Sequence, residues 1–252
     1  MTQHRFRSTS LAVFGIVALF GLASASAAVA SAACPLPAFG PGASYHPSLV
    51  RPGFTANVTN PWFPLTRGRT LVYAGVKDGK RALDLVMTSA RTRLIDGVRT
   101  RIVEDRLYLD GTLEERTSDY YAQDRCGDVW YFGEDTATLD AHGRVTSTDG
   151  SFHAGSGGAE PGVFMQSRPR AGARFRQEWS PGHAEDTYLV LGASSRVRVA
   201  YGTFHHALHT AESTALEPAV LDNKYYARGI GELIEVAIRG PREELRLVEV
   251  IR

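Results

Sequence analysis

The sequence has few of the features that mark a known chemistry. Its 252 residues include only two cysteines, Cys34 and Cys126, so a Cys-x-x-Cys redox pair is absent. It has no Gly-x-Ser-x-Gly motif, which presents the nucleophilic serine in many hydrolases. The run GSGG at 155–158 lacks the Lys-Ser/Thr that a phosphate-binding loop requires. These absences argue against thiol redox chemistry, serine hydrolysis and nucleotide binding.

The sequence also lacks a strong charge of either sign. The formal net charge is +1, with 28 Lys and Arg against 27 Asp and Glu. A nucleic-acid partner would need a concentrated basic face, which this balance does not favour. After residue 33 no apolar run is long enough to cross a bilayer.

One apolar run is present, near the start of the chain. Arg5 and Arg7 precede an uninterrupted apolar stretch at 11–22, and small residues follow it in the run ASASAAVASAA. This layout is typical of a secretory signal peptide, here over residues 1–33, with cleavage after Ala30, Ala32 or Ala33. We therefore expect a secreted or periplasmic protein.

Both cysteines remain after this cleavage. In an oxidising compartment a Cys34–Cys126 disulfide would attach the N-terminal extension to the body of the fold, and two free thiols are the alternative. Lipidation of Cys34 would favour Leu or Val three residues earlier, where the chain has Ser31. Lipoprotein anchoring is therefore not expected.

Short apolar segments that alternate with polar residues dominate the rest of the chain. Asp-Gly pairs separate several of them, at 78–79, 96–97 and 110–111, and this dipeptide suits a tight hairpin turn. The pattern predicts an all-β, mainly antiparallel protein, arranged as a large curled sheet, a half-barrel or a sandwich. On the strand at 233–238, we expect Ile234, Val236 and Ile238 to face a core and Glu235 to face solvent.

Two parts of the chain resemble each other at an offset of 105 residues. YYA at 120–122 matches YYA at 225–227, and Arg91, Arg93 and Gly97 match Arg196, Arg198 and Gly202. We interpret this as two duplicated hairpin units, although any β meander that reuses glycine turns would look similar. The expected organisation is an N-terminal extension (34–59), a first β unit (60–149), a Gly- and Pro-rich loop acting as cover or linker (150–172) and a second β unit (173–252), in one compact domain.

Histidines and carboxylates suggest one candidate metal site. His183 and Glu185 lie just before a predicted strand, and His205 lies in the run FHHALHT. Imidazole and carboxylate groups are common ligands of divalent metals. The three residues would form a site only if the strands bring them together, and solvent-facing polar residues are the alternative.

Acidic residues and aromatic residues give the other candidates. Acidic residues occur in adjacent pairs, at 104–105, 134–135 and 185–186. Neighbours in a strand face opposite sides, so a carboxylate dyad would need members of two different pairs. Tyr120, Trp130 and Tyr225 lie on aromatic strands and are candidates for lining a ligand site, although most strand aromatics serve only in packing.

Two stretches resemble a known group of proteins. NPWFPLTRGRTLVYAG (60–75) and YYARGIG (225–231) are similar to uncharacterised secreted bacterial β-sheet proteins, which look distantly like curled-sheet lipoprotein-carrier envelope proteins. The resemblance implies a curled sheet that holds an acyl chain, and no ligand-contacting residue can be matched.

The sequence thus favours a non-enzymatic secreted or periplasmic protein that binds a lipid or another apolar or amphiphilic small molecule. A divalent-metal protein or metal-dependent hydrolase, and a structural envelope module, are the alternatives.

Overall fold

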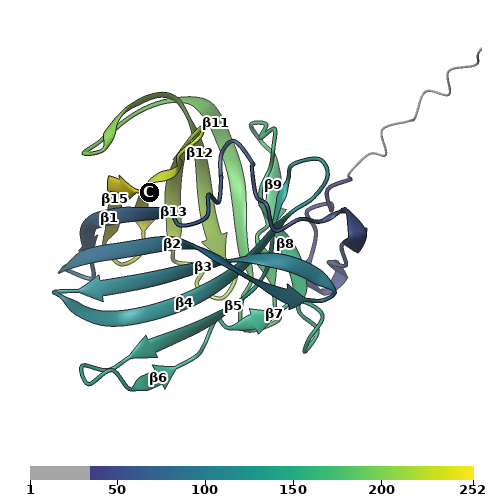
Figure 1. Ribbon diagram of the computed structural model, residues 1–252, viewed down its shortest axis with the longest axis horizontal. Coiled ribbons are helices and arrows are strands. Elements are labelled where there is room, and N and C mark those ends of the chain that lie inside the picture. The colour runs from purple at the N-terminus through teal and green to yellow at the C-terminus, as the bar shows by residue number, and fades with distance from the viewer. Residues whose placement is uncertain (1–34) are drawn as a thin grey trace, which may run out of the picture. The chain divides into compact units, whose positions relative to one another are not determined.

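The computed structural model describes residues 35–252, which form a 15-stranded antiparallel sheet that curls around an interior (Figure 1). The first strands are β1 (Thr70–Lys77), β2 (Lys80–Ile95), β3 (Val98–Leu109), β4 (Thr112–Gln123), β5 (Val129–Leu139), β6 (Val145–Ser147), β7 (Phe152–His153) and β8 (Glu160–Met165). The remaining strands are β9 (Arg174–Arg176), β10 (Glu178–Trp179), β11 (Asp186–Val199), β12 (Gly202–Thr214), β13 (Leu221–Ala227), β14 (Gly231–Arg239) and β15 (Glu243–Ile251). The predicted all-β curled sheet is confirmed.

Two meanders make up most of the sheet. Strands β1 to β5 are neighbours in chain order, and so are β11 to β15. The meanders join where β1 pairs with β15, with Thr70 opposite Ile251 at one end of the ladder. The order along the sheet is β10-β8-β5-β4-β3-β2-β1-β15-β14-β13-β12-β11-β9, and β6 and β7 pair with β5 outside this path.

The two ends of this path meet at a single residue. Strands β9 and β10 lie at opposite ends of the strand order, yet only Gln177 separates them in the chain. Gly162 of β8 lies against this junction, since a Cβ at position 162 would be 2.1 Å from the Gln177 carbonyl. The absence of a side chain at 162 therefore allows the curled sheet to close on itself.

The predicted hairpin turns are confirmed. Asp78, Asp96 and Asp110 have φ angles of 52°, 46° and 48°, and the glycine after each of them also has a positive φ. This is the backbone of a two-residue turn whose twist matches that of the strands it joins. These turns join long, regular hairpins, and the strands of the hairpins form the walls of the interior.

Other local expectations differ from the structure. The segment 150–172 contains β7 and β8, whose apolar residues Phe152 and Val163 are buried, so it forms part of the sheet. Strand β11 is continuous through the Gly192–Ser195 region, where its pairing with β12 shifts in register. Shifts of this kind are β-bulges, which bend a strand without ending it.

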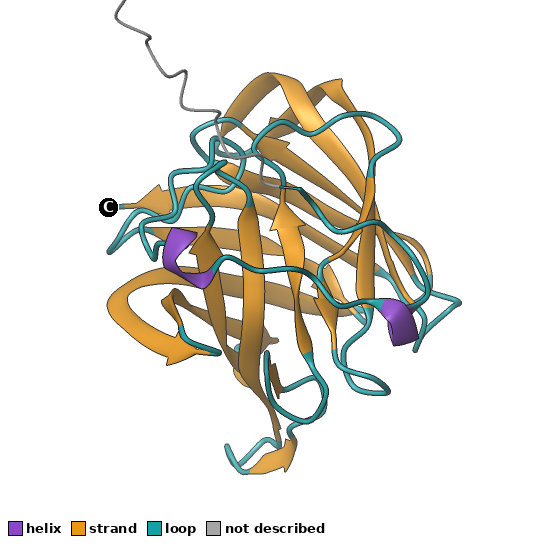
Figure 2. Cartoon of the chain, turned by 90° about the vertical axis from the view of Figure 1, so that its right-hand side faces the viewer, coloured by secondary structure: helices purple, strands orange, loops and turns teal. Residues whose placement is uncertain are grey.

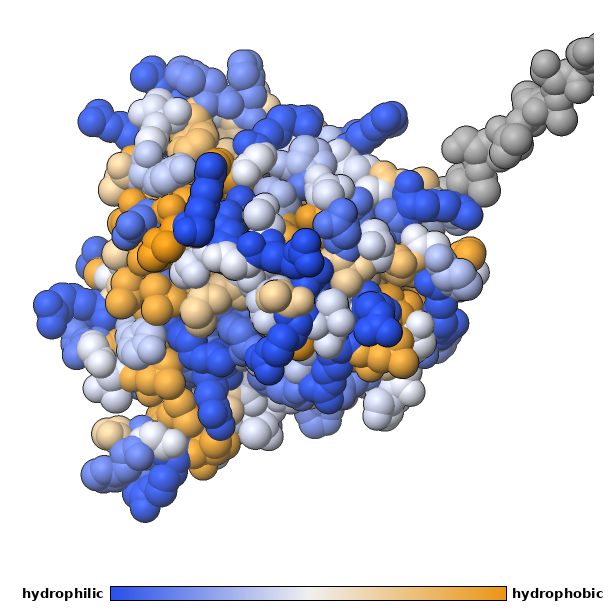
Figure 3. Space-filling view, in the orientation of Figure 1, coloured by the Kyte–Doolittle hydropathy of each residue, from blue (hydrophilic) through white to orange (hydrophobic). Residues whose placement is uncertain are grey.

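The outer face of β3 to β5 is covered by the N-terminal extension, which runs across the sheet and includes two short 3-10 turns, Gly42–Ser44 and Arg51–Gly53 (Figure 2). Leu36, Leu49 and Phe54 pack against a cluster that includes Trp130 and Phe132. On the face seen in Figure 3, apolar residues form several small patches that hydrophilic residues separate. The covered outer face is a second apolar layer.

The two Tyr-Tyr-Ala triplets occupy comparable strands. Residues 120–122 lie on β4 and residues 225–227 on β13, each one strand beyond a hairpin with a long ladder. In each triplet the second tyrosine, Tyr121 or Tyr226, is buried in the same core cluster. The duplication and its unit boundaries stay predictions, and the predicted signal peptide lies outside the described residues.

Candidate binding cavity

A cavity of about 170 Å³ lies within the curl, lined by residues of β1 to β4, β8, β13 and β14 and of the segment before β1. One wall is aromatic. Phe63 and Phe164 have ring centroids 4.6 Å apart, and Tyr121 lies 5.1 Å from the first and 4.9 Å from the second. Leu71 and Val86 extend this apolar wall.

A second wall, which we call acidic, carries five carboxyl groups. They belong to Asp84 on β2, Asp105 on β3, Asp119 on β4 and both Glu232 and Glu235 on β14. The strand registers explain the clustering. Val86 lies opposite Asp105 and Val103 lies opposite Asp119, so side chains on neighbouring strands alternate between apolar and acidic on one face.

A β-bulge allows both glutamates of β14 to reach the cavity. Residues 232 and 235 are three apart and would face opposite sides of a regular strand. The pairing of β13 with β14 shifts between Tyr225 and Tyr226, which adds one residue to β14. The expectation that Glu235 faces solvent is therefore wrong, and Ile238, expected in a core, is 56% exposed.

Two cationic side chains line the same cavity. The Lys224 ammonium nitrogen lies 3.3 Å from Glu212 Oε2 and 3.3 Å from Glu235 Oε1. The Arg69 guanidinium donates hydrogen bonds to the backbone carbonyls of Gly229 and Pro64. Lys224 is thus paired with two carboxylates, whereas the hydrogen bonds of Arg69 go to backbone carbonyls.

Burial shifts the titration of the acidic wall. Removal from water raises the pKa of Asp105 to about 6, that of Asp119 to about 8 and that of Glu232 to about 8. The pKa of Asp84 is raised well above its ordinary value by burial and then by the negative charge of Asp105. Several of these groups therefore carry protons near neutral pH.

The cavity contains polar atoms that the described residues do not satisfy. Asp84 is 8% exposed, and its Oδ1 accepts no hydrogen bond from the described part of the chain. Arg69 is 7% exposed, and its Nε–H likewise has no acceptor there. Buried polar atoms in folded proteins are normally paired. The Asp84 oxygen is therefore available to accept, and the Arg69 N–H to donate, a hydrogen bond with a molecule inside the cavity.

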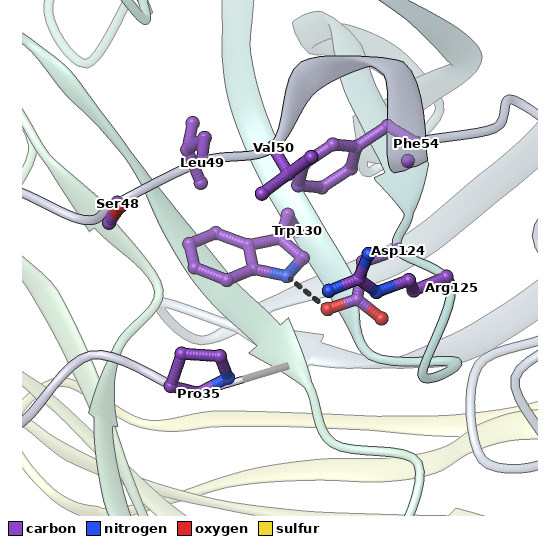
Figure 4. Close-up of a pocket in the computed structure, with 9 residues that line it drawn as sticks. Pro35, Ser48, Leu49, Val50, Phe54, Asp124, Arg125 and Trp130 are labelled. Atoms are coloured by element: carbon purple, nitrogen blue, oxygen red, sulfur yellow. Dashed lines mark hydrogen bonds between the residues drawn. The ribbon is translucent and has the colours of Figure 1, made fainter. Parts of the chain in front are cut away.

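A second, outer pocket of about 260 Å³ lies beneath the extension. Leu49, Val50 and Phe54 surround the Trp130 ring, and the indole N–H donates to Asp124 Oδ2 at 3.2 Å (Figure 4). Of the predicted ligand-lining aromatics, Trp130 is thus the one that lines this outer pocket.

The other two predicted aromatics lie away from the acidic cavity. Tyr120 is buried toward the outer face and donates its hydroxyl to Asp135 Oδ2 at 2.5 Å. Tyr225 stacks on His209 with centroids 4.3 Å apart and lines a surface hollow. In the first triplet the adjacent tyrosine, Tyr121, lines the cavity. The sequence does not reveal which tyrosine of each pair faces inward.

The predicted metal ligands are not brought together. His183 lines a surface hollow with Glu134, Asp135 and His153, while the Glu185 side chain accepts the Gly182 N–H. His205 is exposed on β12. Within residues 35–252, no group of three or more His, Cys, Asp or Glu side chains is placed to hold a metal ion. The metal hypothesis gains no support from this arrangement.

The predicted disulfide has one partner, Cys34, outside the described residues, so the pairing stays a prediction. Pro35, which follows Cys34 in the sequence, and Arg125, which precedes Cys126, line the same outer pocket and so lie close together (Figure 4). This proximity is what a Cys34–Cys126 bond would require.

The first of the acidic pairs behaves as strand geometry predicts. Asp105 faces the cavity, while Glu104 faces outward and lies 2.6 Å from Arg91 and 2.8 Å from Arg106. In the next pair, Asp135 bonds Arg93 and Tyr120 on the outer side. Sequence reasoning did not single out Asp84, Asp119 or Lys224. Their only signal is a charged residue at the inward position of an alternating strand.

In the described part of the chain, we find no helix with the length and hydrophobicity needed to span a membrane. No family model matches the sequence, and no curated protein does. A solved structure from Bacteroides fragilis, described as exported with a YmcC-like fold, is 10% identical, with a TM-score of 0.44 over 76% of this chain and 99% of that chain. Another from Parabacteroides distasonis, described as a lipoprotein, is 9% identical, with a TM-score of 0.39 over 75% and 97%. Both similarities are low, and nothing about function is inferred from them.

Proposed function

We propose that this is a non-enzymatic secreted or periplasmic protein that binds a small amphiphilic molecule inside its curled sheet. One observation carries the proposal: a single cavity has an aromatic wall, an acidic wall and a buried Asp84 oxygen that accepts no hydrogen bond from residues 35–252. Ligand sites commonly combine apolar walls with a few convergent polar groups. A purely apolar ligand would leave the polar wall without partners.

The acidic wall changes the ligand class expected from the sequence. An acyl chain alone would bring apolar atoms against Asp84, Asp105 and Asp119, at the cost of leaving buried polar groups unpaired. An amphiphilic molecule places its apolar part on Phe63 and Phe164 and its polar part on the carboxyl side. The small volume favours a compact molecule over a long chain.

The role of a structural module that binds through a sheet edge is less favoured. The terminal strands β9 and β10 have three and two residues, and Gln177 joins them directly. Such short edges offer few backbone groups to a strand from another protein.

Native mass spectrometry of the protein purified from cells that export it tests the proposal. We expect a bound small molecule on the wild type, and we expect Val86→Phe, whose ring would enter the cavity, to lose it. Val145→Phe is the matched control, because Val145 is 49% exposed on β6. Absence of a bound molecule on the wild type, or its full retention by Val86→Phe, would contradict the proposal.

A further inference from the structure

We propose that the ligand is an organic cation, an ammonium group on a short apolar body, held with its nitrogen among the carboxyl groups of Asp84, Asp105 and Asp119. This inference rests on the proposed function and names the chemical class that the cavity would take. It follows from the charge balance, the hydrogen-bonding groups and the aromatic wall of the cavity.

The charge balance leaves carboxyl groups without cations. Five carboxyl groups and two cationic side chains line the cavity. Lys224 is already paired with Glu212 and Glu235. None of the ion pairs found among residues 35–252 includes Asp84, Asp105, Asp119 or Glu232. A guest that supplies a positive charge would complete this set.

The hydrogen-bonding groups point to a donor. Carboxylate oxygens accept hydrogen bonds, and an ammonium group provides three donors and no acceptor. The Asp84 Oδ1 atom, buried and without a donor in the described residues, is the place where such a donor is missing. A guest carboxylate would instead bring its acceptor oxygens and its negative charge next to the carboxylates of the cavity, which repel it. The Arg69 Nε–H, on the same cavity, can donate to a hydroxyl or carbonyl oxygen of the guest.

The aromatic wall suits a cation that carries an apolar body. Phe63, Tyr121 and Phe164 line the same cavity as the carboxyl groups, and aromatic faces attract cations. Leu71 and Val86 give contact area to a short alkyl or aryl body. A volume of about 170 Å³ limits that body to a few carbon atoms.

Binding of a cation should release protons. The titratable groups that line the cavity with Asp84 are Arg69, Tyr73, Asp105, Asp119, Tyr121, Lys224, Glu232 and Glu235. Without a guest, burial keeps the pKa of Asp84, Asp105 and Glu232 above the ordinary range, so these carboxyl groups keep their protons to higher pH than ordinary carboxyl groups do. A guest cation favours the ionised carboxylate, so affinity should rise as pH increases through about 6 to about 8.

Isothermal titration calorimetry with three matched probes tests the inference: hexylammonium chloride, hexanol and sodium hexanoate. We expect the ammonium to bind at least about tenfold more tightly than the alcohol, which corresponds to about 1.4 kcal/mol, and the carboxylate to bind least. Equal binding of all three probes would overturn the cation inference and leave the proposed function intact. Binding of the alcohol alone would do the same. Binding of none would overturn both.

Two variants test whether the ammonium group binds next to Asp84. Asp84→Asn keeps the shape and removes the charge, so we expect about tenfold weaker binding of hexylammonium and little change for hexanol. Glu249→Gln, at an exposed position on β15, is the control and should bind as the wild type does. In buffers of different ionisation enthalpy, the wild type should release protons on binding and Asp84→Asn should release fewer. Unchanged hexylammonium affinity in Asp84→Asn, with its thermal midpoint preserved, would contradict the placement.

Discussion

Asp84 and Asp105 face one cavity from neighbouring strands, and the negative charge of Asp105 adds to burial in raising the pKa of the Asp84 carboxyl. Two carboxylates that face one buried cavity repel each other, so the pair retains a proton to a higher pH than isolated carboxyl groups would. The interior of this protein is therefore a place where protons are held, and its stability should depend on pH.

We expect thermal stability to fall as pH rises from about 4 to about 9. The folded-state pKa is raised to about 6 for Asp105 and to about 8 for Asp119 and Glu232, so the folded protein binds these protons more tightly than the unfolded chain. Their stabilising contribution is complete below the ordinary carboxyl pKa and is lost as pH passes through these raised values. Scanning calorimetry across this range measures the effect.

Asp119→Asn isolates one contribution to this slope. The amide oxygen can still accept the Tyr131 hydroxyl, which donates to Asp119 Oδ1 at 2.5 Å, but the side chain no longer titrates. The decline above about pH 6 should become shallower than in the wild type. Asp149→Asn, at an exposed position, should keep the wild-type slope. Identical slopes in both variants would refute this role of Asp119.

Removing the Lys224 ammonium should destabilise the fold. Lys224→Met would leave Glu212 and Glu235 without the cation that lies 3.3 Å from each, and breaking a buried ion pair costs about 3–5 kcal/mol. The midpoint of urea unfolding should decrease. Lys80→Met, at an exposed position on β2, should change it little, and a similar loss in both variants would argue against a structural role for the buried pair.

Gly162→Ala should weaken the closure of the sheet. The added methyl would meet the Gln177 backbone at 2.1 Å, and overpacking of this kind costs about 1–3 kcal/mol. Gly192→Ala is the control, because Gly192 also lies on a strand and a Cβ there has open space around it. The urea-unfolding midpoints of the two variants are compared, and we expect the lower one for Gly162→Ala. Equal midpoints would show that the added methyl at 162 is tolerated.

The predicted Cys34–Cys126 disulfide is open to a direct test. Alkylation of the processed protein with and without reductant should reveal two protected thiols, released together. Cys126→Ser should lower the free energy of unfolding by about 2–5 kcal/mol, the usual loss when a native disulfide is removed. Full alkylation without reductant would show that the bond is absent.

The sequence predicted the strands well and the cavity poorly, for physical reasons. Asp-Gly turns such as Asp96-Gly97 are decided by two adjacent residues, so they can be identified locally. The inward direction of Glu235 depends on a bulge set by the pairing of β13 with β14, which no local pattern contains. Glu232 on β14 lies far in the sequence from Asp84 on β2 and Asp105 on β3, so their meeting became visible only with the fold.

The pairing of β1 with β15 also constrains how this protein is made. A nascent chain that has emerged only as far as β5 has one long edge of β1 without its partner, since Ile251 lies opposite Thr70. Pairings between distant parts of a chain form slowly, and unpaired edges invite association with other chains. Lys224, Glu232 and Glu235 reach the cavity from β13 and β14, so the cavity is completed only after these late strands have joined the sheet.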